Sequence, residues 1–158
     1  MKIVLNTSPI IFLNKIGYLH LLASCATDIS VPSHVVRELG QEKIPEFIQV
    51  KQLSLSSSAY VQGAIGRLHE GELSAMLLAQ ESKADRVILD DLLARKKAQS
   101  LGLKVMGTVG LLLLMHKRKL LSREHTWQAI IDLTQQHGMY LSPSIMATVK
   151  QTLFAQGI

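Results

Sequence analysis

Short runs of apolar residues alternate along the chain with longer segments in which apolar residues recur at helical spacing. The short runs are followed by polar or glycine-containing turns, which is typical of strands buried on both faces of a parallel sheet. We predict five such strands, which hold residues 3–5, 29–31, 48–50, 87–89 and 103–106.

The longer segments predict helices, many of which end at a glycine, the usual helix stop. The predicted helices cover residues 10–16, 19–22, 33–39, 59–68, 71–85, 92–101, 111–116 and 122–137, and a last one begins at Ser142-Pro143. The serine-rich segment 54–58 is predicted to be a connection. Because strands and helices alternate, the fold class is α/β: a three-layer α/β/α sandwich with a mainly parallel sheet.

Length and composition agree with this architecture. A chain of 158 residues is expected to form a single domain, with C-terminal helices from about residue 122 packing on it. The apolar content of 47% and the mean hydropathy of +0.22 suit a sheet covered on both faces. The single cysteine, Cys25, excludes an internal disulfide and fits a reducing compartment.

Neither a secretory signal nor a membrane span is expected. Polar residues such as Asn6 and Lys15 interrupt the apolar N-terminal segment. The apolar run 109–115 is far shorter than the ~20 residues that a membrane helix needs, and it predicts a buried helix. We therefore expect a cytoplasmic protein.

Candidate catalytic and metal-binding residues follow the predicted strands or lie in the helices after them. Asp90 and Asp91 follow one strand, Asn6 follows another, Glu72 begins a helix, and Glu38 ends the helix after the second strand. Ligands gather at the carboxyl edge of such sheets, and a carboxylate cluster is unfavourable without a cation. Oxygen ligands favour Mg²⁺ or Mn²⁺, which can activate water against a phosphodiester.

Each of these acids also has a purely structural reading. Asp is a preferred helix N-cap, which would explain Asp91, and Asp90 would serve as a ligand, a neighbour of a ligand or a cap. A carboxylate at a helix N-terminus is favourable by itself, which would explain Glu72. Glu38, late in a helix, would be a solvated charge.

Four segments in order resemble the PIN-domain family, nearest to its VapC-type toxin ribonucleases with GExxA and DDxxAR motifs. They are VLNTSPIIFLNKIGYLHLL, VPSHVVREL, GELSAMLLA and VILDDLLARKKAQSLGLKVMGTVGLLLL. The resemblance implies a PIN fold and Mg²⁺- or Mn²⁺-dependent RNA cleavage that leaves a 3′ hydroxyl and a 5′ phosphate. It further implies a homodimer held in check by a cognate antitoxin protein.

Carried over by position, the resemblance implies roles for individual residues. The catalytic acids are Glu38, Glu72 and Asp91 with Asp90 alongside; the metal ligands are Asn6, Glu72 and Asp91; and the adjacent hydroxyl pair is Thr7 and Ser8. Apart from the resemblance, the basic run Arg95, Lys96 and Lys97 would hold an RNA backbone through its charge. The net charge of +5 and the pI near 9.5 lean towards polyanionic partners, although basic runs also occur as solvated faces.

One position departs from the family pattern. The first strand normally ends in Asp, and here it ends in Asn6, whose amide oxygen can bind a cation but carries no charge and cannot act as a base. The chain is therefore a naturally impaired member, an engineered inactive form, or an active variant with amide ligation. The alternative function is a catalytically silent PIN domain that binds RNA or protein. A receiver-like phosphoacceptor is disfavoured because Asn6-Thr7 supplies no acidic pair.

Overall fold

Five parallel strands form a single sheet in the described part of the chain. The computed structural model describes residues 1–63 and 70–155. The strand order is β3-β2-β1-β4-β5, and every neighbouring pair is parallel. The strands are β1 (Lys2–Leu5), β2 (Asp28–Pro32), β3 (Gln49–Lys51), β4 (Arg86–Ile88) and β5 (Val105–Met106). The predicted α/β class with a parallel sheet is confirmed.

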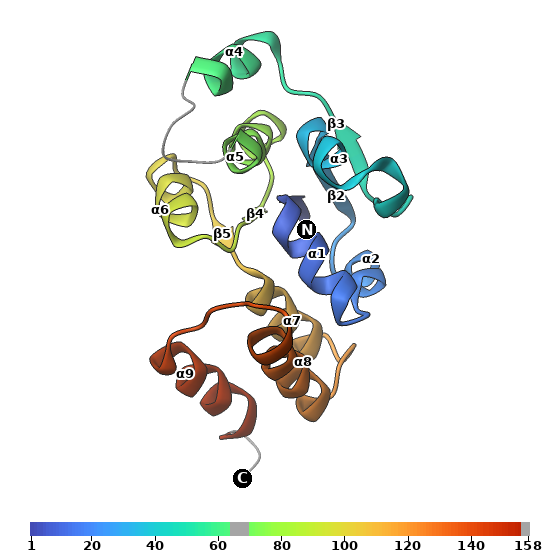
Figure 1. Cartoon of the computed structure of the whole chain (residues 1–158), viewed down its shortest axis with the longest axis vertical. Coiled ribbons are helices and arrows are strands. Elements are labelled where there is room, and N and C mark those ends of the chain that lie inside the picture. Colours follow the sequence, from blue (N-terminus) through green and yellow to red (C-terminus); the bar gives the residue numbers. More distant parts are fainter. Residues whose placement is uncertain (64–69, 156–158) are drawn as a thin grey trace.

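Helices fill the connections between the strands and extend the chain beyond the sheet (Figure 1). They are α1 (Thr7–Lys15), η1 (Leu19–Leu21), α2 (Leu22–Cys25), α3 (Ser33–Leu39), η2 (Gln41–Lys43), α4 (Leu55–Gly63), α5 (Glu70–Ser82), α6 (Leu92–Ser100), α7 (Thr108–Lys117), α8 (Arg123–Gln136) and α9 (Pro143–Phe154). In Figure 1, α4 lies at the upper end of the molecule and α9 at the lower end.

The alternation of side chains along the central strand explains the three layers. Ile3 and Leu5 face a core shared with α1, α7, α8 and α9, whereas Val4 faces a second core shared with α4, α5 and α6. All three side chains are fully buried. Because successive residues of a strand point to opposite faces, a continuous apolar run requires a cover on both sides.

The apolar run 109–115 belongs to the first core, as the sequence predicts. Leu111, Leu112 and Met115 on α7 are fully buried there. Within residues 1–63 and 70–155, no helix has the length and apolar content to cross a membrane.

The strand order brings the candidate site residues that follow β1 and β4 to one edge of the sheet. The chain leaves β1 towards β2 on one side and later returns to add β4 on the other side of β1. Leu5 lies opposite Ile88, so the residues after β1 and after β4 emerge together. This reversal of direction is where parallel sheets hold their ligands.

The prediction that residues 54–58 form a connection is wrong. Helix α4 begins at Leu55, and Ser54 caps it by accepting a hydrogen bond from the Ser57 amide at 3.2 Å. The Glu81 carboxylate, at the far end of α5, accepts bonds from the Ser54 amide and hydroxyl. A partner 27 residues along the chain therefore holds this end of α4 in place. The predicted helix 59–68 overlaps α4, and its residues 64–68 lie outside the described part.

Replacing Glu81 by glutamine should make the stability of the fold less dependent on acid. Hydrogen bonds from Ser54, and then Ser57, lower the pKa of Glu81 below its ordinary value of 4.5. A lowered pKa stabilises the fold above the unfolded-state pKa, and this contribution disappears as the pH falls through the folded-state value. Glu81 is exposed, so we expect a difference of at most about 1 kcal/mol.

The measurement is urea unfolding of the native chain and Glu81→Gln at pH 6 and below pH 4. The native chain should be the more stable at pH 6, and the two should converge in acid. Glu46→Gln is the control, because Glu46 is exposed and has no hydrogen bond within the described residues. A constant gap at both pH values would contradict the proposed linkage.

Candidate active site

A cavity of ≈ 380 Å³ opens at the carboxyl edge of the sheet, where β1 and β4 end. All the acidic, amide and hydroxyl residues predicted at the strand ends line it, although they come from segments far apart in the sequence. The lining residues are Asn6, Thr7, Ser8, Ile11, Glu38, Gly71, Glu72, Asp90 and Asp91.

The end of β1 supplies the neutral side of the cavity. Asn6 is 8% exposed, and its backbone amide donates to the Ile88 carbonyl at 3.3 Å, which ties it to β4. It occupies the N-cap position of α1 without making a side-chain capping bond. The Thr7 hydroxyl is buried and has no hydrogen-bond partner among the described residues. A polar atom left in this state is costly unless a ligand or water satisfies it.

Glu38 lies against Gly71, the residue that precedes Glu72, so the two acids line the same cavity. Glu72 is 7% exposed in the first described turn of α5, while the Glu38 side chain on α3 is 41% exposed. A β-carbon at Gly71 would lie 2.9 Å from a Glu38 carboxylate oxygen and 2.7 Å from the ring of His34. Any side chain at this position would therefore displace the His34 ring or the Glu38 carboxylate.

His34 is a site residue that sequence reasoning missed. Its Nε2 lies 2.5 Å from a Glu38 oxygen, one helical turn away on α3. Its Nδ1 lies 3.4 Å from the Arg37 guanidinium and 3.8 Å from the Glu70 carboxylate. The sequence does not draw attention to His34, because the histidines lack metal-ligand spacing. The available signal was the i,i+4 pairing of His34 with an acid already singled out.

Asp90 is held by three hydrogen bonds from two other elements. Its oxygens accept from the Ser8 hydroxyl at 2.9 Å and from the Thr108 amide and hydroxyl, each at 2.7 Å. Helix α7 begins at Thr108 after Gly107, which has no side chain with which to cap it. Asp90 thus caps α7 from the end of β4 and joins it to α1.

Asp91 caps the helix that it precedes, which is the structural reading given above. Its carboxylate accepts from the Ala94 amide at 2.9 Å. The basic residues Arg95, Lys96 and Lys97 follow within the first two turns of α6, outside the cavity lining. In residues 1–63 and 70–155, no ion pair includes any of the three.

The donor set fits a hard divalent cation by its chemistry. The lining side chains offer carboxylate, amide and hydroxyl oxygens, the ligands that Mg²⁺ and Mn²⁺ prefer, and the unpartnered Thr7 hydroxyl lies among them. Among the described residues, however, no three His, Cys, Asp or Glu side chains form a ready metal cage. Glu38, Asp90 and Asp91 each make a bond within the protein instead.

Comparison with known proteins identified one family. A family model described as a PIN domain matches residues 2–154, which is nearly the whole chain. No curated protein and no solved structure gave a significant match.

Proposed function

Since the chain belongs to the PIN-domain family, whose members are mostly metal-dependent nucleases, we propose that it is an endoribonuclease of the toxin type. The observation that carries this proposal is the meeting of Glu38, Glu72, Asp90 and Asp91 around one cavity. Four carboxylates in a shared space repel one another, and a bound cation offsets that repulsion.

Each residue has a proposed part in the reaction. Glu72 and Asp91, with the amide oxygen of Asn6, would hold Mg²⁺ or Mn²⁺. A metal bound there would activate water and neutralise charge on the phosphodiester. The water adds to phosphorus as the P–O3′ bond breaks, and O3′ takes a proton from solvent, which gives a 5′ phosphate and a 3′ hydroxyl. Glu38 would accept the proton of the attacking water. Asp90 would keep Ser8 and the end of β4 in place through the bonds described above.

The basic residues on α6 would hold the RNA. Asp91 at the cavity and Arg95, Lys96 and Lys97 lie on one helix, so a phosphate backbone bound to these cations would run past the acids. Contacts of this kind carry no sequence preference and weaken with salt. We also propose that the protein forms a homodimer and that a cognate antitoxin protein restrains its activity.

A second candidate function is a catalytically silent domain that binds RNA or protein. Asn6 favours it because the cavity lacks the charge that the family pattern places there. The bonds that Asp90 and Asp91 make within the protein favour it too, because a metal would have to compete with them.

Asn6→Asp separates the two functions. Adding a carboxylate beside the metal should raise Mn²⁺-dependent cleavage of labelled single-stranded RNA by about tenfold or more, by analogy with the 10–100-fold effects of changes around metal ligands. Asn14→Asp is the matched control, because Asn14 is exposed on the same helix and gains the same charge.

The assay is run with Mn²⁺, with Mg²⁺ and with a chelator. Cleavage that persists under chelation would reject the metal mechanism. No cleavage by either the native chain or Asn6→Asp would support the silent binding domain.

A further inference from the structure

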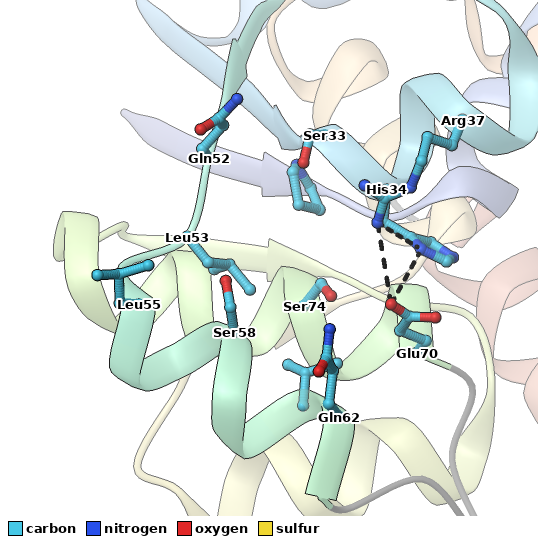
Figure 2. Close-up of a pocket in the computed structure, with 12 residues that line it drawn as sticks. Ser33, His34, Arg37, Gln52, Leu53, Leu55, Ser58, Gln62, Glu70 and Ser74 are labelled. Carbon is cyan, nitrogen blue, oxygen red and sulfur yellow. Dashed lines mark hydrogen bonds and ion pairs between the residues drawn. The ribbon is translucent and has the colours of Figure 1, made fainter.

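A second cavity, of ≈ 330 Å³, lies beside the acidic one between α3, α4, α5 and the segment after β3 (Figure 2). His34 separates the two, because it lines the second cavity while its Nε2 contacts Glu38 of the first. Glu70 and Glu72, two residues apart on α5, likewise line the second and the first cavity. We call the second cavity the α3–α4 pocket, lined by Pro32, Ser33, His34, Arg37, Gln52, Leu53, Leu55, Ser58, Val61, Gln62, Glu70 and Ser74.

The walls of the α3–α4 pocket carry polar groups that are not used elsewhere in the described chain. Gln62 extends from α4 into the space below His34 and Glu70, and Gln52 lies on the opposite wall (Figure 2). In residues 1–63 and 70–155, neither amide group has a hydrogen-bond partner. Leu53 and Val61 provide apolar surface between them. Most of the lining is polar, and its convergent amide and charged groups can fix the orientation of a polar ligand.

Opposite charges stand side by side on the rim. The Arg37 guanidinium lies 3.8 Å from the Glu70 carboxylate, and both lie close to His34. Arginine only donates hydrogen bonds and a carboxylate only accepts them. The pocket therefore presents an acceptor next to a donor, and the Arg37 charge offsets that of Glu70.

We propose that the α3–α4 pocket binds the base of the RNA nucleotide next to the scissile phosphate, and that guanine is its best match. This inference rests on the proposed nuclease function. The Watson–Crick edge of guanine has two neighbouring N–H donors, suited to Glu70, and the adjacent Hoogsteen edge has the acceptors O6 and N7, suited to Arg37. Adenine has no N–H at the corresponding ring nitrogen.

A base fits this pocket better than a protein segment does. Single-stranded RNA is recognised through splayed bases that enter pockets and bond through their edges. A volume of ≈ 330 Å³ is at the lower end of the range for small-molecule sites and accommodates one nucleotide. The pocket adjoins the acidic cavity at the His34–Glu38 contact, so a base bound in it would lie near a phosphate held by the acids.

The test is fluorescence anisotropy with two 5′-fluorescein RNA hexamers, UUUGUU and UUUAUU, in the presence of EDTA. Chelation removes metal-dependent cleavage, so binding is read independently of catalysis. The guanine hexamer should bind about tenfold more tightly, since a good bidentate contact to a base gives ~1–3 kcal/mol of discrimination. Glu70→Gln and Gln62→Leu should each reduce this preference to about twofold. Gln151→Leu is the control, because Gln151 is exposed on α9 and undergoes the same change. It should leave the preference intact.

Equal binding of the two hexamers, or a preference that Glu70→Gln leaves intact, would overturn the base pocket. If the chain then still cleaves RNA with Mn²⁺, the nuclease proposal stands and only the pocket fails. In the opposite case, the chain binds guanine selectively, Gln62→Leu abolishes this selectivity, and no metal supports cleavage. That result would support the base-binding proposal and refute the nuclease proposal.

Discussion

Glu72→Gln is expected to reduce Mn²⁺-dependent RNA cleavage at least about 100-fold, because changes merely around a metal's ligands already cost 10–100-fold. Glu72 is the most buried of the candidate acids, at 7% exposure. Glutamine has nearly the same shape but no charge, so the substitution removes electrostatic attraction for a cation and leaves the packing in place. If Asn6 keeps the native rate too low to measure, the comparison is made in an Asn6→Asp background.

The stability of the same variant shows whether Glu72 acts through charge or through structure. Removing one charge from a cluster of carboxylates relieves repulsion, so the melting temperature should stay the same or rise. Glu124→Gln is the control, because Glu124 also lies in the first turn of a helix, exposed on α8. A lower melting temperature in step with the loss of cleavage would indicate that Glu72 holds the fold together and would contradict a role in metal binding.

The convergence of the acids could be predicted because it follows from simple rules of parallel sheets. Ile3–Leu5 and Val87–Leu89 are continuous apolar runs, which require cover on both faces and therefore interior positions in the sheet, and the structure pairs them directly. Once β1 and β4 are adjacent, the residues after them, Asn6 and Asp90, must lie at one edge. The residue types at that edge then indicate the chemistry.

The features that the sequence did not reveal depend on long-range partners. Four serines within residues 54–58 have the composition of a loop, and their helical state depends on Glu81, far along the chain. The α3–α4 pocket is formed by three helices and a connecting segment, and no local spacing of residues predicts it. Local sequence patterns predict which face of a helix or strand is buried. They do not predict which distant side chain forms hydrogen bonds with its terminal residues.

The same limit applies to the pair Asp90-Asp91. The sequence allowed either residue to be a ligand or a cap, and in the structure both cap helices. Asp91 caps α6, the helix that follows it directly, which local rules anticipate. Asp90 caps α7, whose first residue is 18 positions further on, and this depends on β5 lying next to β4. Their roles in catalysis remain predictions that substitution can separate from capping.

Asp90→Ala is expected to lower the free energy of unfolding by about 2–4 kcal/mol, the combined cost of a lost helix cap and of buried donors left unpaired. Thr108 is fully buried, so neither its amide nor its hydroxyl can turn to water when the carboxylate is removed. The Ser8 hydroxyl loses its partner as well. For a chain of this length, the melting temperature should fall by about 5–12 °C.

Asp90→Asn distinguishes the cap from a metal ligand. The asparagine oxygen can still accept from the Thr108 amide, and its NH₂ group can donate to the two hydroxyls, which rotate to accept. Asp90→Asn should therefore retain most of the stability that Asp90→Ala loses. A strong loss of cleavage in this stable variant would make Asp90 a metal ligand as well as a cap. Asp132→Ala is the control, because the only hydrogen bond of the Asp132 carboxylate within the described residues comes from Gln128 on the same helix. An Asp90→Ala melting temperature no lower than that of Asp132→Ala would contradict the cap, because Thr108 would then have found another partner.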